Sequence, residues 1–199
     1  TEHMKQFTPL ELPLYKTHYQ SAYKQFDKYF LFIERGLNLL KPNGLFGYIV
    51  PSKFTKVGAG KKLREFLASK KEVEQIISFG ANQIFQDKTT YTCLLILKKT
   101  EQEHLNYLEV QSLKDWKTRN IASHNYDSVE FEKLDDDGWT LVPGNLKPIF
   151  ESIESQSQTL ELLIGSENIY NGIQTSANNI YIHTATNEDE QFYYFQKDG

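Results

Sequence analysis

Apolar residues follow two patterns along the first half of the chain, one helical and one typical of buried strands. From Asp27 onward the pattern is helical: Phe32 and Ile33 begin a series of apolar positions on one helix face, and Asp27 is suited to cap the helix. The sequence Lys-Pro-Asn-Gly that follows predicts a tight turn. Residues 45–50 are then almost continuously apolar over strand length, which indicates a strand covered on both faces of a parallel sheet.

The alternation of helix and strand continues to residue 98. Residues 61–69 predict a second helix, and residues 73–79 and 91–98 predict two more strands with no helix between them. This order is typical of an open α/β sheet whose last connection is a hairpin. Such a sheet binds ligands outside the carboxyl ends of its strands, so Pro51-Ser52-Lys53 is expected at a functional edge.

The second half of the chain has a different character. In residues 101–158, a charged turn runs into an apolar segment at "LDDDGWTLVP", and we interpret this region as a connector that follows a first domain of residues 1–100. From Thr159 the sequence "TLELLIGSENIYNGIQTSANNIYI" is rich in Ile, Tyr and Asn with turn-forming Gly. Residues 159–199 are therefore predicted to form the start of a β-rich second domain.

Composition and charge narrow the class of protein. Hydrophobic content of 39% with 14% aromatic residues is typical of a globular protein, and one cysteine excludes a disulfide framework. We expect no membrane partner and a cytoplasmic location, because no apolar run approaches the ~20 residues of a membrane span. Residues 1–100 carry a net charge of +8 and residues 101–199 carry −12. The basic residues of the first half are densest at Lys53, Lys56, Lys61, Lys62, Arg64, Lys70 and Lys71.

Two explanations fit this basic segment equally well at the level of sequence. It is either a solvated helix face or a surface beside a polyanion. A search for chemical motifs yields little else: there is no Gly-x-Gly-x-x-Gly, no phosphate-binding Gly-Lys-Ser/Thr loop, and no histidine or cysteine spacing that would bind a metal. Cys93 is interpreted as a buried structural thiol, and Asp135 to Asp137 as a solvated turn.

Several segments in a fixed order resemble one enzyme family. The sequence "DKYFLFIERGLNLLKPNGLFGYIVPSKF", followed by "LREFL", "VEQIISFGANQIFQDKTTYTCLLILKK" and "GIQTSANN", resembles the gamma-class N6-adenine DNA methyltransferases. More narrowly, it is similar to the bifunctional type II (type IIG-like) restriction–modification enzymes. The resemblance implies that residues 45–50, 73–79 and 91–98 are the last three strands of a seven-stranded Rossmann-like methyltransferase sheet. It also implies that a target-recognition domain begins after that sheet.

The resemblance further implies where the missing motifs lie. In the family, a glycine-rich S-adenosylmethionine loop and a catalytic Asn-Pro-Pro-Tyr/Phe motif precede these strands, and neither motif occurs in this sequence. The segment "ELPLYKTHYQ" resembles the one that follows the catalytic motif. We therefore expect the chain to begin just downstream of that motif, to be catalytically silent alone, and either to self-associate or to cover its open sheet edge with its own N-terminal segment.

Particular residues match positions that have roles in the family. Phe85 matches the aromatic residue that stacks on the extruded adenine, and Phe32 matches the aromatic residue beside the adenine ring of S-adenosylmethionine. For Phe32 the alternative is packing on the apolar face of its own helix. Lys53 and Lys88 are candidates for contact with double-stranded DNA.

The C-terminal segment carries further candidates for contact with DNA. Thr175 and Asn178 match the start of the family's target-recognition segment, although Ser176 stands where the family often has Gly.

The functions that fit the sequence fall into different classes. The first is part of a DNA methyltransferase of a restriction–modification system that transfers methyl from S-adenosylmethionine to N6 of adenine. A second is a methyltransferase that acts on RNA or protein with the same sheet. A third is a non-catalytic nucleic-acid-binding specificity module. An Asn-Pro-Pro-Tyr/Phe motif upstream in the gene would distinguish these three.

Overall fold

The structure is a computed structural model that describes residues 7–85, 90–118, 125–134, 138–168, 187–188 and 193–194. The chain divides into two compact units, Thr1–Phe150 and Glu151–Gly199. The first unit contains a mixed α/β sheet, which confirms the predicted α/β class. Within the described residues, no helix is both long and apolar enough to cross a membrane.

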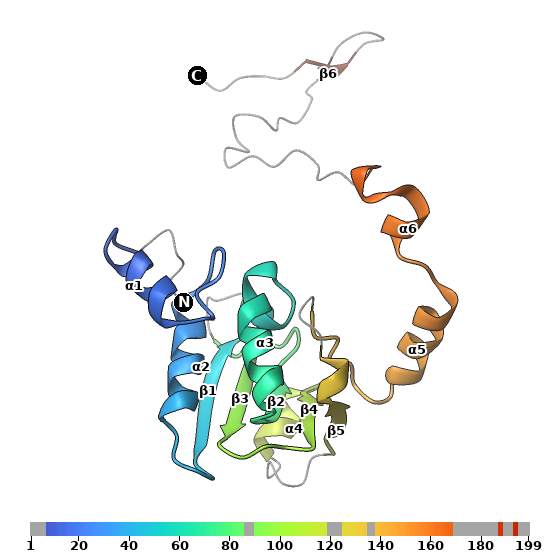
Figure 1. The fold of residues 1–199 in the computed structure, drawn as a ribbon. Helices are drawn as coiled ribbons and strands as arrows, with labels where there is room; N and C mark the ends of the chain where they lie inside the picture. Colours follow the sequence, from blue (N-terminus) through green and yellow to red (C-terminus); the bar gives the residue numbers. More distant parts are fainter. Residues whose placement is uncertain are drawn as a thin grey trace. The chain divides into compact units, whose positions relative to one another are not determined.

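Five strands form the sheet of the first unit, in the order β1-β3-β2-β4-β5 (Figure 1). Their bounds are Leu45–Pro51 (β1), Val73–Ser78 (β2), Thr92–Lys98 (β3), His104–Glu109 (β4) and Asp127–Glu130 (β5). The β3 strand lies between β1 and β2 and is antiparallel to both, with Val50 opposite Cys93. All three predicted strands are therefore present, and consecutive strands β2 and β3 pair antiparallel as predicted.

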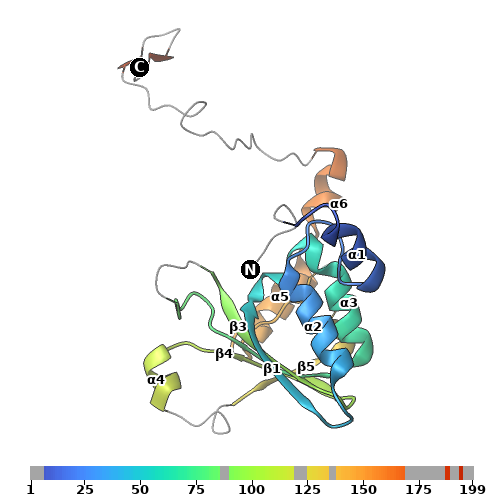
Figure 2. The same cartoon turned by 90° about the vertical axis from the view of Figure 1, so that its left-hand side faces the viewer.

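Helices cover both faces of this sheet (Figure 2). Helices α2 (Lys28–Leu39) and α3 (Lys61–Lys70) lie on one face, and both were predicted from the apolar periodicity. Their buried side chains, such as Ile33 and Leu67, pack on the inward side chains of the strands to form the main core. Helix α4 (Leu113–Thr118) lies on the opposite face, where Trp116 packs edge-on against Phe79 at 5.8 Å between ring centroids.

The structure differs from the prediction in residues 101–158, which were expected to be a connector. Strand β4 extends the sheet by pairing parallel to β2, and β5 pairs antiparallel to β4. Trp139 is fully buried in the main core, so the chain contributes to the first unit well beyond residue 100.

The start of the predicted β-rich domain is helical in the structure. Residues Lys147–Gln156 form α5 and Leu160–Ile164 form α6, and the only other described elements beyond them are the 3₁₀ turn Ser166–Asn168 and two strands of two residues. These strands, β6 (Asn187–Glu188) and β7 (Tyr193–Tyr194), pair antiparallel. Residues 169–186 lie outside the described residues, so the β-rich recognition domain stays a prediction.

Candidate functional site

The loops that follow β1 and β2 meet the segment before β3 at one edge of the sheet. The Ser52 backbone amide donates to the Tyr91 carbonyl at 2.9 Å, and the Phe79 amide donates to the Thr92 carbonyl at 3.0 Å. We call this edge the rim: residues 52–57 after β1, residues 79–85 after β2, and residues 90–91 before β3. The rim is the carboxyl end of β1 and β2, where the sequence predicted a functional edge.

Residues 52–57, which we call the rim loop, form a closely packed turn. Ser52–Thr55 is a 3₁₀ turn in which the Thr55 hydroxyl donates to the Ser52 carbonyl at 2.8 Å. Phe54 is fully buried and packs edge-on against Trp139 at 6.1 Å, while the Trp139 amide donates to the Thr55 carbonyl at 2.8 Å. The rim loop is therefore part of the core on one side, and Trp139, which the sequence analysis did not single out as functional, supports it.

Helix α2 holds the beginning of the rim loop. The Tyr29 hydroxyl donates to the Pro51 carbonyl at 3.2 Å, and burial together with the Asp27 carboxylate raises the pKa of that hydroxyl above its usual range. Asp27 stands at the N-cap position of α2 but makes no capping hydrogen bond with its side chain. Its buried carboxylate instead pairs with the Lys53 ammonium at 2.5 Å. Lys53, predicted as a DNA contact, thus neutralises a buried charge in this structure.

Helix α3 holds the end of the rim loop through a buried cation. Arg64 is 1% exposed, and its Nη1 donates to the carbonyls of Phe54 at 2.7 Å and Val57 at 2.9 Å. Arg64 was predicted to lie in a basic surface segment, and this prediction is wrong because its guanidinium satisfies backbone carbonyls inside the fold. Besides Lys53, two lysines of the same segment pair with acids: Lys62 with Glu65 and Lys71 with Glu132.

Both aromatic side chains predicted to contact ligands, Phe85 and Phe32, are exposed, and so is Tyr91 of the rim. Phe85 is 48% exposed in the segment after β2, so it is not a core residue. Phe32, on the first half of α2, is 60% exposed and turned away from the buried positions Ile33 and Leu37. The alternative that Phe32 packs on the apolar face of its helix is therefore wrong. The other predicted contacts, Lys88, Thr175 and Asn178, lie outside the described residues.

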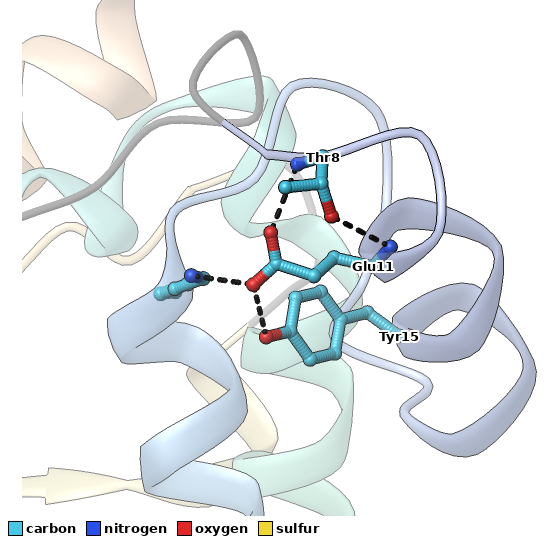
Figure 3. Close-up of polar contacts among 4 residues, drawn as sticks. Thr8, Glu11 and Tyr15 are labelled. Carbon is cyan, nitrogen blue, oxygen red and sulfur yellow. Dashed lines mark hydrogen bonds and ion pairs between the residues drawn. The ribbon is translucent and has the colours of Figure 1, made fainter.

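A polar cluster fixes helix α1 (Glu11–His18) beside the N-terminus of α2 (Figure 3). The Thr8 hydroxyl accepts from the Glu11 amide at 3.3 Å, while the Glu11 carboxylate accepts from the Thr8 amide at 2.8 Å. The same carboxylate accepts from the Tyr15 hydroxyl at 3.0 Å and from Lys28 at 2.9 Å. These donors, the Thr8 amide first among them, lower the pKa of Glu11 to about 2. The sequence signal for this capping box is Thr8-Pro-Leu-Glu11, which the sequence analysis missed.

The described residues bring binding groups to the rim rather than a set of reacting groups. Within them, no three His, Cys, Asp or Glu side chains come together in a way that could hold a metal ion. Burial raises the pKa of the Cys93 thiol to about 12, which agrees with the predicted structural role. What the rim offers chemically is the exposed rings of Phe85 and Tyr91 beside a firmly held loop.

Comparisons with known proteins identify relatives of this chain. Residues 1–85 match the model of the Eco57I restriction-modification methylase family. The chain is 48% identical over all of its 199 residues to the type II restriction enzyme and methyltransferase RM.Eco57I of Escherichia coli, of which it spans 20%. It is 26% identical over 185 residues, 84% of this chain, to the type II methyltransferase M.BstVI of Geobacillus stearothermophilus, of which it spans 33%.

A solved structure shares the fold. The type IIG restriction endonuclease BpuSI superposes with a TM-score of 0.55 and 17% sequence identity, over 77% of this chain and 21% of that protein. At this level of identity the similarity describes the fold alone. The chain spans a fifth to a third of the length of these relatives.

Proposed function

This chain belongs to the Eco57I-type restriction-modification methylases, and from that membership we propose that it forms part of a DNA methyltransferase specific for N6 of adenine. The family supports a role in DNA methylation; the adenine specificity and the cofactor S-adenosylmethionine are part of the proposal. The single observation that carries it is the half-exposed ring of Phe85 in the segment between β2 and β3. An enzyme that acts on a base extrudes it and needs a flat apolar surface to hold it.

Phe32 provides a second flat surface in this proposal. S-adenosylmethionine supplies the methyl group when it is bound, and an exposed aromatic ring fits a stacking contact with its adenine moiety. Phe32 lies in the turn of α2 that follows Tyr29, whose hydroxyl reaches the rim at Pro51. The 60% exposure of Phe32 leaves its ring open to such a ligand.

The sheet order fits the same proposal. Strand β3 between β1 and β2, antiparallel to both, corresponds to the last three strands expected for a seven-stranded methyltransferase sheet. In this arrangement the outer edge of β1 pairs with a fourth strand. Lys53, Lys88, Thr175 and Asn178 are proposed to contact double-stranded DNA. Action on cellular DNA corresponds to a cytoplasmic location.

The test compares this chain with the complete product of its gene. Each is incubated with plasmid DNA and S-adenosylmethionine labelled in the methyl group, and N6-methyladenine is measured by mass spectrometry after digestion. We expect the complete product to form N6-methyladenine. The chain alone should form none and should bind S-adenosylmethionine weakly by calorimetry, because its sequence has neither the glycine-rich loop nor the catalytic tetrapeptide.

The other outcomes contradict the proposal in different ways. Label in RNA or protein but not in DNA would favour the alternative substrates. Specific DNA binding by the complete product without any transfer would favour the specificity module. Tight cofactor binding and transfer by the chain alone would show that the missing motifs are not required.

A further inference from the structure

We infer that Arg64 is a positioning residue, which fixes the rim loop so that Ser52 and Lys53 are presented rigidly to the substrate of the proposed methyltransferase. This inference rests on the proposed function. Arg64 itself touches no substrate, because its side chain is 1% exposed and lies under the loop. Its effect on the reaction is transmitted through the backbone of residues 52–57.

The contacts of Arg64 are those of a residue that shapes a backbone. Its Nη1 donates to both the Phe54 and Val57 carbonyls, which close the second half of the rim loop. Guanidinium is a planar donor of fixed geometry, so two carbonyls held by one nitrogen are held in a fixed relation to each other. A buried cation is costly unless its hydrogen bonds are made, which indicates that the loop and Arg64 are stable only together.

The backbone around Arg64 is closely packed. A Cβ atom at Gly60 would lie 2.3 Å from the Phe54 carbonyl oxygen and 2.9 Å from Nη1 of Arg64. The start of α3 therefore approaches the rim loop as closely as a glycine permits. A side chain at this position would push the loop and the guanidinium apart.

Other elements hold two more carbonyls, one just before the loop and one within it. Tyr29 of α2 donates to Pro51, and the Trp139 amide donates to Thr55. Three separate parts of the chain thus hold four carbonyls within seven residues, and the side chain of Lys53 is tied to the buried Asp27. Such a loop loses little conformational entropy when a ligand binds it, which is the physical advantage of preorganisation.

The first test follows the loop itself and does not depend on the proposed function. Hydrogen exchange is measured by mass spectrometry on this chain and on its Arg64→Lys and Gly60→Ala variants. Lys retains the charge but lacks the planar fork. We expect exchange to rise about tenfold or more at the amides of Lys56 and Val57, which donate to the Lys53 carbonyl, and to stay unchanged in β1 and β3. The matched control is Arg35→Met at an exposed position of α2, which should leave the rim loop unchanged.

The second test uses the complete gene product. At a temperature where Arg64→Lys is folded, we expect kcat/KM for DNA per folded molecule to fall about ten- to a hundredfold, because small displacements at a substrate-facing site are costly. The fluorescence of 2-aminopurine at the target base should fall with it, and cofactor affinity should be unchanged. A purely structural role lowers the melting temperature and leaves these kinetic values intact.

The outcomes separate the inference from the proposed function. If the unmodified complete product methylates no DNA, the proposed function fails, while the exchange test still decides whether Arg64 fixes the loop. If both Arg64→Lys and Gly60→Ala exchange at the rim loop like the unmodified chain, or if Arg64→Lys methylates DNA normally per folded molecule, Arg64 is not a positioning residue.

Discussion

Phe85 lies in the segment between β2 and β3 with 48% of its surface exposed, so its removal should affect ligand binding more than folding. Base–aromatic stacking contributes ~1–3 kcal/mol per base, and Phe85→Ala in the complete gene product should weaken capture of the extruded adenine roughly ten- to a hundredfold. Phe85→Tyr and Phe85→Trp should retain most of the activity, because both keep an aromatic face. Fluorescence of 2-aminopurine at the target base measures the capture.

A thermal melt provides the control for Phe85. Truncating a buried phenylalanine typically costs ~3–5 kcal/mol, and Phe54, the fully buried phenylalanine of the rim loop, is the matched position for that effect. Phe85→Ala should change the melting temperature far less than Phe54→Ala. A large drop in melting temperature with normal methyl transfer by the remaining folded protein would refute the stacking role.

The lowered pKa of Glu11 predicts how the stability of the chain changes at acid pH. The pKa of its carboxyl lies at about 2 in the folded chain, below the usual 4.5, because Thr8, Lys28 and Tyr15 donate to the charged form. A lowered pKa means that this stabilisation is fully present above pH of about 4.5 and is lost as the pH falls toward about 2. As the pH falls from about 4.5 toward about 2, Glu11→Gln should therefore lose less melting temperature than the unmodified chain.

The matched control for Glu11 is Glu154→Gln, at an exposed position of α5. It should follow the unmodified chain across the same pH range. Equal pH dependence of Glu11→Gln and the unmodified chain would mean that the cluster around Thr8 does not hold the charged carboxylate in solution.

Residue roles were predictable where they depend on local pattern and not where they depend on distant partners. The exposure of Phe85 agrees with its position between an apolar residue and a polar run. Asp27 and Lys53 are 26 positions apart in sequence, and nothing local indicates that they form a pair. Arg64 sits among lysines in the sequence, so only the fold reveals that it points at the carbonyls of Phe54 and Val57.

At the scale of elements, continuous apolar runs were the reliable signal. Strands β1 and β3 were predicted because each is flanked by turn residues and nearly continuously apolar over strand length. Strand β4, "HLNYLE", was missed although it is as long and as polar as β2, because its place is decided by pairing with β2, about thirty residues away. Strand pairing is a tertiary feature, so the sequence of β4 alone does not indicate which strand it joins.

The packing of α2 on β1 gives a prediction about these two elements. A Cβ atom at Gly36 would lie 2.8 Å from Cζ of Phe46, so the helix approaches the strand where it has no side chain. Gly36→Ala should destabilise the chain by about 1–2 kcal/mol, because overpacking exceeds the gain of ~1 kcal/mol in helix propensity. Urea denaturation measures the change.

A double-mutant cycle isolates this contact. In a Phe46→Leu background the ring is absent, and Gly36→Ala should become neutral or stabilising by up to about 1 kcal/mol. If Gly36→Ala stabilises the chain equally with Phe46 present, the close approach of α2 to β1 is not maintained in solution.

At the scale of the whole molecule, the outer edge of β1 determines how the chain should behave in solution. Strand β1 lies at one end of the sheet. Along its outer edge, no described strand and no described residue of the N-terminal segment pairs with it. Leu45 and Ile49 on this strand are 63% and 42% exposed. An unpaired strand edge with apolar side chains is a template for pairing with another chain, so we expect the isolated chain to self-associate.

Two lysine substitutions decide whether β1 is responsible. A charge on an edge strand blocks edge-to-edge pairing, so Ile49→Lys should shift the chain toward monomer in light scattering and sedimentation. The matched control is Leu162→Lys in α6 of the second unit, where the leucine is 77% exposed. If Leu162→Lys disperses the chain and Ile49→Lys does not, association uses the apolar helix instead. A monodisperse monomer of the unmodified chain would show that the β1 edge does not mediate self-association. The proposal that a fourth strand pairs with this edge would then lose its physical support.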